Sequence, residues 1–171
     1  MPYDISMIGS SIFEFWGTPQ WGQLSISNQA IRSSTSDFWL HNDLSTLPAA
    51  SNILVYCGSN DLIFGNNSEQ IMANLHALII NLSMQFPKAQ IGYFSILNCP
   101  QKQAAKQLPI IEQINNQMRI QAGNQYHYFE FNDAIRNQTK WFTDDGLHLT
   151  SDAYEMLNKF YQPIIETWVG Y

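Results

Sequence analysis

The chain has few charged side chains and no basic cluster. Lys and Arg together number 8 against 14 Asp and Glu, which gives a formal net charge of −6. Nucleic acids and anionic membranes both select a cationic surface, so we expect neither to be the main partner. Charged residues make up only 13% of the chain, and Asn, Gln and Ser fill the surface instead.

Long hydrophobic runs are also missing, since no stretch approaches the roughly 18 apolar residues of a membrane span. No basic segment followed by an apolar one precedes Met7, so we expect no signal peptide and a cytoplasmic location. Cys57 and Cys99 form no CxxC pair and have no histidine at metal-ligand spacing, which disfavours a disulfide and a zinc site. We therefore expect no metal and no cofactor. The oligomeric state stays open.

The chain is long enough for one domain with a sizeable core, and an apolar content of 45% excludes wholesale disorder. We find no internal repeat or linker and predict a single domain over residues 1–171. Short apolar runs alternate with longer segments of helical periodicity. The predicted strands are Ile5–Ile8, a weaker Gln23–Ile26, Asn52–Tyr56, Gln90–Ser95 and Tyr126–Phe131.

Three longer helices are predicted between and after these strands. Apolar residues recur at helical spacing in Ser68–Gln85, for which Ser68 is the predicted N-cap. A second helix covers Leu108–Ala122, and a third begins at a Ser151 cap and ends near Trp168. This alternation predicts an α/β fold in which a mostly parallel sheet has helices on both faces.

Polar residues follow the predicted strands at the points where each strand ends. Ser10 and Ser11 follow the first strand, Gly58–Asp61 follows Asn52–Tyr56, and Asp145–His148 precedes the last helix. Open parallel sheets bind their ligands at the carboxyl ends of the strands. We therefore expect these three segments to meet at one edge of the sheet.

His148 is the candidate general base. Asp145 lies three residues earlier across a turn, and this spacing can bring a carboxylate to Nδ1 and fix the tautomer of the ring. Taken alone, the pair also fits a solvated loop with an incidental Asp and His. The other histidines, His41, His76 and His127, lie in contexts typical of structural residues.

Ser11 is the candidate nucleophile, because a helix can begin where the chain leaves the first strand and its N–H groups can stabilise an oxyanion. The alternative is that Ser10 and Ser11 only cap that helix. Asn60 is a candidate oxyanion donor, since Gly58 allows a sharp turn after the buried strand. The alternative for Asn60 is an ordinary Asx-turn.

These residues resemble the SGNH (GDSL-type) hydrolase superfamily of esterases, lipases and acylhydrolases over nearly the whole chain. The GDS block of the family is similar to Gly9–Ile12, which implies Ser11 as nucleophile. Its GxND block matches Gly58–Asp61, with Asn60 as a side-chain oxyanion donor, and its DxxH block matches Asp145–His148. The resemblance implies a flavodoxin-like three-layer α/β/α sandwich with five parallel strands, and ester hydrolysis without a cofactor.

Two positions depart from the family pattern. Ser10 replaces the usual Asp before the nucleophile. The second block, normally close to NxGIxGxT, corresponds to Asn28–Thr35, so Ser33 stands where the family has its oxyanion glycine. Its N–H can still act as a donor beside that of Ser11, but a positive φ would strain a serine. Arg32, in the same loop, either faces the pocket or is solvated.

The sequence predicts a serine esterase that cleaves small carboxylic esters through an acyl-enzyme. The short chain leaves no room for a large lid, which favours small acyl groups, and a carboxylesterase and a carbohydrate O-deacetylase both fit. Five aromatic residues lie near the motif loops, and we expect at least half of them in the core: Phe13, Phe15, Trp16, Trp21 and Phe64. The alternative is a catalytically silent binding module of the same fold. A flavodoxin-like nucleotide binder is disfavoured, because no Gly-rich phosphate loop follows a strand.

Overall fold

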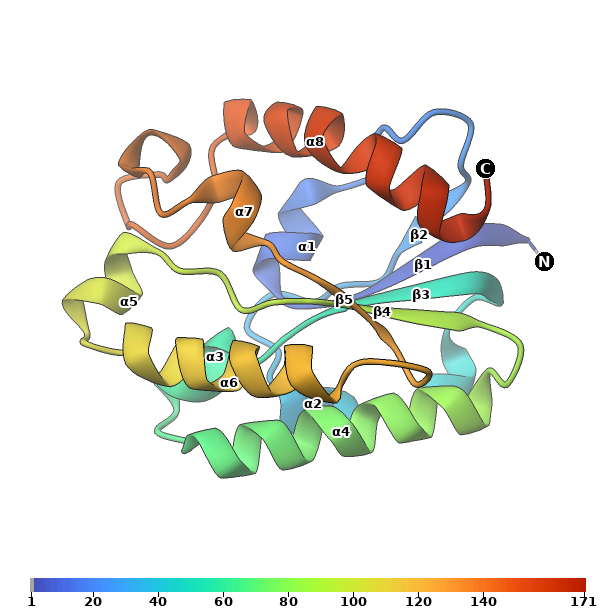
Figure 1. The fold of residues 1–171 in the computed structure, drawn as a ribbon, viewed down its shortest axis with the longest axis horizontal. Coiled ribbons are helices and arrows are strands. Elements are labelled where there is room, and N and C mark those ends of the chain that lie inside the picture. Colours follow the sequence, from blue (N-terminus) through green and yellow to red (C-terminus); the bar gives the residue numbers. More distant parts are fainter. Residues whose placement is uncertain (1) are drawn as a thin grey trace.

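A computed structural model describes residues 2–171. Its five strands form one parallel sheet in the order β2-β1-β3-β4-β5. The helices cover both faces, so the predicted α/β fold and three-layer sandwich are confirmed (Figure 1). The strands are β1 (Tyr3–Gly9), β2 (Ile26–Asn28), β3 (Ala50–Tyr56), β4 (Gln90–Phe94) and β5 (His127–Phe129).

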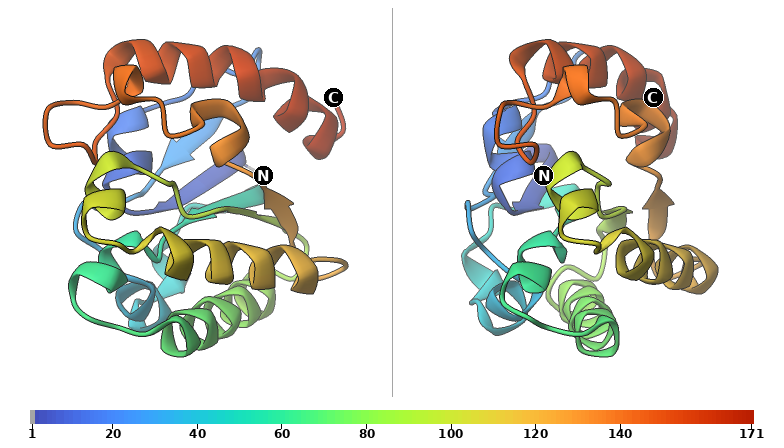
Figure 2. Two further views of the ribbon diagram at one scale, coloured as in Figure 1. Left: turned by 60° about the vertical axis from the view of Figure 1, so that its left-hand side comes forward. Right: turned by 90° about the vertical axis from the view of Figure 1, so that its left-hand side faces the viewer.

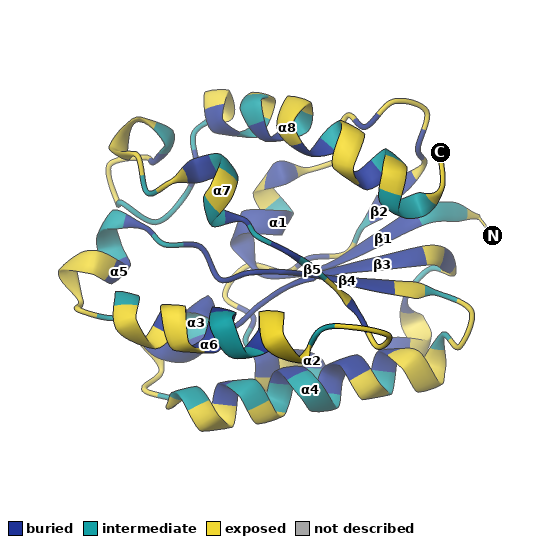
Figure 3. Cartoon of the chain, viewed as in Figure 1, coloured by how far each residue is buried: buried dark blue, intermediate teal, exposed yellow. Residues whose placement is uncertain are grey.

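The strands β1 and β3 form the centre of the sheet and are buried on both faces (Figure 3). This burial explains their continuous apolar runs, because helices cover a parallel sheet from both sides. One face carries α1 (Ser11–Trp16), α7 (Asn132–Ile135) and α8 (Ser151–Val169). The other face carries α2 (Ser36–His41), α3 (Ser59–Ile63), α4 (Ser68–Gln85) and α6 (Leu108–Gln121). The end view in Figure 2 shows α8 and α4 on opposite sides of the sheet.

The remaining elements are short. They are α5 (Pro100–Ala104), η1 (Leu44–Thr46) and η2 (Thr139–Trp141), the last two being 3-10 turns. The aromatic residues near the motifs divide as expected: Phe13, Trp16 and Trp21 are buried in the core, whereas Phe15 and Phe64 are 43% and 67% exposed.

Two strand predictions need correction. The second strand covers Ile26–Asn28 rather than Gln23–Ile26, because Ile26 is the first residue that pairs with β1. The residue before it, Ser25, is instead held by the Asp4 carboxylate through its N–H and its hydroxyl. The last strand covers only His127–Phe129 of the predicted Tyr126–Phe131.

The caps of two helices lie one residue earlier than predicted. Asn67, not Ser68, caps α4 by accepting a hydrogen bond from the Gln70 N–H. Thr150, not Ser151, caps α8 in the same way. Both capping residues have extended backbone, which aims the side chain at the free N–H groups of the first turn. The bounds of the three long helices agree with the predictions to within one residue. The helix α6 ends at Gln121 rather than Ala122, and α8 ends at Val169 rather than near Trp168.

Candidate active site

Ser11, Asp145 and His148 come together at the carboxyl edge of the sheet. His148 Nε2 lies 3.1 Å from Ser11 Oγ, and His148 Nδ1 lies 2.5 Å from Asp145 Oδ2. Ser11 is the first residue of α1, which is separated from β1 by Ser10 alone, and the other two residues belong to the loop before α8. The arrangement is a Ser–His–Asp triad, in which the imidazole can take the proton of the hydroxyl while the carboxylate holds the ring.

The Asp145 carboxylate is held by a dense set of donors. Its Oδ1 accepts hydrogen bonds from the His148 N–H at 2.9 Å, the Leu147 N–H at 2.8 Å and the Thr143 hydroxyl at 2.8 Å. Burial raises the pKa of Asp145, but these hydrogen bonds and the one to the His148 ring outweigh it and hold the pKa well below its usual range. Asp145 is therefore ionised at neutral pH, and its Oδ2 is left facing the imidazole.

The turn that carries Asp145 packs against α5. The Gln101 N–H donates to the Gly146 carbonyl at 2.9 Å, and the Thr143 N–H closes the loop on the His148 carbonyl at 2.8 Å. Gly146 has a φ of 67°, and a Cβ there would lie 3.2 Å from the Gln101 nitrogen. A glycine thus lets the turn approach α5. The roles of Thr143 and Gln101 were missed, since no motif marks them in the sequence.

Backbone contacts behind the nucleophile fix the position of Ser11. A Cβ on Gly9 would lie 2.0 Å from the Tyr56 carbonyl oxygen, so only glycine permits the close approach of β1 to the end of β3. The Ser10 N–H donates to that same carbonyl at 3.0 Å. Ser10 occupies the N-cap position of α1, but its side chain makes no capping hydrogen bond. Of the two serines, Ser11 is the one whose hydroxyl meets His148.

Asn60 reaches across to the loop that contains Ser33 and Ser34. Its Nδ2 donates to the Ser34 carbonyl at 3.0 Å, which uses one of its two N–H bonds and leaves the other available. Gly58 is the N-cap of α3 and has a φ of 119°, and this turn brings Asn60 to the edge of the sheet. The alternative of an Asx-turn does not hold, because no N–H within residues 2–171 donates to the Asn60 Oδ1 and the amide nitrogen bonds to another segment.

Ser33 has a φ of 63°, in the left-handed region where the family has glycine. A side chain in this conformation costs about 1–2 kcal/mol. The Ser33 N–H donates to no group within residues 2–171. The anticipated positive φ at this position is therefore present, and the role of the Ser33 N–H as an oxyanion donor stays a prediction.

The Ser33–Ser34 loop is anchored by a buried polar network. The Asp61 carboxyl group accepts hydrogen bonds from the Ser36 N–H, at 3.1 and 3.0 Å to its two oxygens, and from the Ser36 hydroxyl. On the other side of the loop, the Ser34 hydroxyl donates to the Gly9 carbonyl at 2.9 Å and accepts from the Trp39 indole at 2.9 Å. These contacts fix the backbone that presents the Ser33 N–H.

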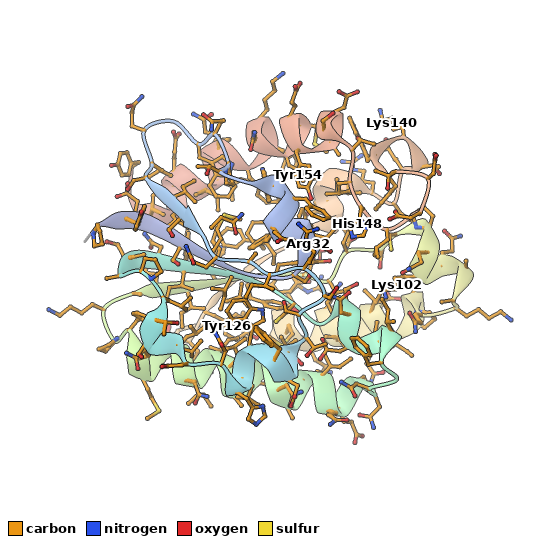
Figure 4. The ribbon with its side chains drawn as sticks, turned by 180° about the vertical axis from the view of Figure 1, so that it is seen from behind. Arg32, Lys102, Tyr126, Lys140, His148 and Tyr154 are labelled. Carbon is orange, nitrogen blue, oxygen red and sulfur yellow. The ribbon has the colours of Figure 1, made fainter. Side chains whose placement is uncertain are left out.

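Arg32 lies at the rim of the site, with its side chain 65% exposed. Its Nε donates to Glu14 Oε2 at 2.9 Å, and its guanidinium lies over the Phe15 ring, 5.0 Å from the centroid. Phe15 in turn meets the His148 ring edge-on at a centroid distance of 5.3 Å. In Figure 4, Arg32 and His148 lie close together beside α1. Arg32 is thus solvated on one side and packed against an aromatic wall on the other.

The remaining candidate groups lie outside the triad. His41, His76 and His127 make no hydrogen bond to a triad residue within residues 2–171. Cys57 and Cys99 are free and buried, as expected, and burial raises the pKa of the Cys57 thiol. No helix in the described part of the chain is long and apolar enough to cross a membrane.

The fold and the site define an α/β protein with a Ser–His–Asp triad at the carboxyl edge of a parallel sheet. The family model of the GDSL-like Lipase/Acylhydrolase family matches residues 8–156, which include all the triad residues. The chain belongs to this family, and the resemblance seen in its sequence is confirmed.

Solved structures of similar fold come from several organisms. A protein of Streptococcus pneumonia is 23% identical with a TM-score of 0.81, and the alignment covers 96% of this chain and 85% of that one. The psychrotrophic esterase EstA from Pseudoalteromonas sp. is 18% identical with a TM-score of 0.76, covering 98% and 100%. A carbohydrate esterase family 3 protein from Talaromyces cellulolyticus is 13% identical with a TM-score of 0.73, covering 96% and 97%. At these identities the similarity shows the fold. Comparison with curated protein sequences finds no significant match.

Proposed function

We propose that this chain is a serine esterase that hydrolyses small carboxylic esters through an acyl-enzyme, with Ser11 as the nucleophile. The observation that carries the proposal is the continuous contact from Asp145 through His148 to the Ser11 hydroxyl, at 2.5 and 3.1 Å. Membership of the GDSL-like Lipase/Acylhydrolase family supports it.

In the first half of the reaction, Ser11 Oγ attacks the ester carbonyl carbon and its proton passes to His148 Nε2. The negative charge on the carbonyl oxygen is stabilised by the N–H groups of Ser11 and Ser33 and by the Asn60 amide. When the tetrahedral intermediate collapses, the C–O bond to the alcohol breaks, and the alcohol leaves with the proton from Nε2. The acyl group remains on Ser11.

In the second half, a water molecule attacks the acyl carbon and gives its proton to His148 Nε2. The bond to Ser11 Oγ then breaks, Oγ regains the proton, and the carboxylic acid leaves. Asp145 stays ionised throughout and stabilises the imidazolium that forms in each half. The residues of this chain supply every proton transfer in this cycle.

The short chain leaves no room for a large lid, which favours substrates with small acyl groups. Carbohydrate O-deacetylation is one form of the proposed activity. Among proteins of similar fold, the Talaromyces cellulolyticus protein is described as a carbohydrate esterase.

The test is turnover of p-nitrophenyl acetate together with labelling by a fluorophosphonate; EstA was solved inhibited by a related reagent, monoethylphosphonate. We expect labelling at Ser11, and we expect Ser11→Ala to lower kcat by about 10⁴–10⁶-fold at unchanged fold. Ser10→Ala is the matched control and should keep both labelling and turnover. A folded wild-type protein with neither would instead be a catalytically silent binding module. Retained turnover in Ser11→Ala would rule out Ser11 as the nucleophile.

A further inference from the structure

A cavity of about 530 Å³ opens beside His148 and lies outside the set of oxyanion donors. Its walls are Phe15 of α1, the loop residues Thr143, His148 and Leu149, and one face of the first turns of α8. This volume falls within the range of small-molecule sites, roughly 300–1,000 Å³. Figure 4 shows Tyr154 of α8 near His148 on this side of the molecule.

The position of the cavity indicates which half of an ester it would hold. In the proposed reaction His148 protonates the leaving oxygen, so the alcohol must leave from the side of the imidazole. Neither Ser33 nor Asn60 lines this cavity, whereas His148 does. The cavity therefore adjoins the alcohol half of the substrate, and the acyl oxygen points away from it toward the oxyanion donors.

Besides Thr143 and His148, the polar groups of the cavity come from one face of α8. Asn158 Oδ1 accepts the Trp16 indole N–H at 2.7 Å, which fixes the orientation of the amide and leaves its Nδ2 as a free donor. Glu155 is exposed and its carboxylate makes no hydrogen bond to residues 2–171, so it is a free acceptor. The Tyr154 hydroxyl is already used, since it donates to the Ile12 carbonyl at 2.7 Å.

Phe15 provides an aromatic wall that is held in place from two sides. The Arg32 guanidinium lies over its ring at 5.0 Å, and the ring meets His148 at 5.3 Å. Yet Phe15 remains 43% exposed and lines the cavity. An aromatic wall flanked by a free acceptor and a free donor suits a molecule that has an apolar C–H face and several hydroxyl groups around it.

We propose that the cavity beside His148 is the subsite for the alcohol half of the ester and takes a sugar, held by Phe15, Glu155 and Asn158. This inference rests on the proposed esterase function and names its substrate class. A long-chain alcohol would make no hydrogen bond with Glu155 or Asn158 and would gain nothing from either group. A choline-like cation would suit Phe15 and Glu155 but offers no acceptor to the Asn158 amide.

The test compares acetate esters that share one acyl group and differ in the alcohol: 6-O-acetyl-D-glucose, ethyl acetate and acetylcholine. We expect kcat/KM for the sugar ester to exceed that for ethyl acetate by about tenfold or more, the size of one or two hydrogen bonds. In Glu155→Ala this ratio should fall about tenfold, chiefly through KM. Asp152→Ala, which removes a carboxylate from the same helix turn but outside the cavity, should leave the ratio unchanged.

The outcomes separate the two proposals. Hydrolysis of ethyl acetate without preference for the sugar ester, or a preference for acetylcholine, would overturn the sugar subsite and leave the esterase intact. An unchanged ratio in Glu155→Ala would overturn the role of this cavity. Failure of a folded protein to hydrolyse any of the three esters would overturn both proposals.

Discussion

The Asn60 side chain donates a hydrogen bond to the Ser34 carbonyl at 3.0 Å, and this contact joins two segments that lie 26 residues apart in the sequence. It ties the first turn of α3 to the loop that contains Ser33. Asn60 therefore has two tasks in the proposed mechanism, because one N–H braces the loop and the other is left for the oxyanion.

Replacing Asn60 tests both tasks. Asn60→Ala removes a donor to the oxyanion, and loss of one such donor typically lowers kcat by about 10²–10³-fold. Because the Ser34 carbonyl also loses its partner, we expect the decrease to lie toward the upper end of that range. Steady-state kinetics with p-nitrophenyl acetate measures it. Asn124→Ala, at an exposed loop position, is the control. Equal kcat values for the two variants would contradict the oxyanion role.

Ser33 combines a useful N–H with an unfavourable backbone conformation. At a φ of 63° its side chain costs about 1–2 kcal/mol, whereas the extra freedom of a glycine in the unfolded chain costs about 0.5–1 kcal/mol. We therefore expect Ser33→Gly to raise the free energy of unfolding by about 0.5–1 kcal/mol. Urea denaturation measures this change, and kcat should be retained because the N–H is unaltered.

The control for this substitution is Lys106→Gly, at a second non-glycine position with a similar φ of 58° but no contact with the triad. Both variants should gain stability. A loss of stability in Ser33→Gly alone would mean that the Ser33 side chain makes a stabilising contribution that exceeds its strain.

The central fold was predictable because its signals are local. The runs of β1 and β3 are continuously apolar since both faces of a central parallel strand are buried, and α4 shows its buried stripe directly in the sequence. The short helices α2, α3, α5 and α7 were not predicted, because segments of 4 to 6 residues span too few turns for periodicity to appear. The caps were misassigned because the backbone angle decides between neighbouring polar residues.

The site was predictable only in part for a similar reason. Ser11, Asn60, Asp145 and His148 follow strands or lie in a short motif, so their convergence follows from the topology of a parallel sheet. The anchoring of the oxyanion loop by Asp61 joins residues that lie 25 positions apart, and no local pattern marks it. Neither the φ of Ser33 nor the cavity face of α8 could be read from composition or spacing, because both depend on tertiary packing.

The donors around Asp145 make Asp145→Asn an informative substitution. An asparagine whose carbonyl oxygen takes the place of Oδ1 would satisfy the Thr143 hydroxyl and the N–H groups of Leu147 and His148. Its amide would then donate to His148 Nδ1, which places the ring proton on Nε2 and blocks proton transfer from Ser11. We expect kcat to fall by about 10⁴-fold, as for a triad with the wrong tautomer.

Two measurements check this explanation for Asp145→Asn. The melting temperature should stay close to that of the wild type, since the three donors keep an acceptor, and fluorophosphonate labelling should slow in parallel with kcat. Full activity in this variant would show that Asp145 does not control the tautomer of His148.

Lys102, in α5, is fully buried, and its Nζ has no hydrogen-bond partner within residues 2–171. Burial lowers the pKa of Lys102, and the nearby Cys99 opposes this shift only in part. A buried ammonium without a partner is destabilising, so we expect Lys102→Met, which keeps the length of the side chain, to raise the free energy of unfolding by about 1–3 kcal/mol at pH 7. Lys88→Met, at an exposed site, should change it by less than about 0.5 kcal/mol.

The pH dependence of this gain distinguishes a charge effect from better packing. Because the pKa of Lys102 is lower in the folded state, the unfolded chain binds the proton more tightly between the folded value and about 10.5. The free energy of unfolding of the wild type therefore rises as Lys102 loses its proton in this interval. The difference in free energy of unfolding between Lys102→Met and the wild type should shrink from pH 7 to pH 10. Guanidinium denaturation of both proteins at several pH values measures the difference. An advantage that stays constant with pH would mean that the buried ammonium is not what Lys102→Met relieves.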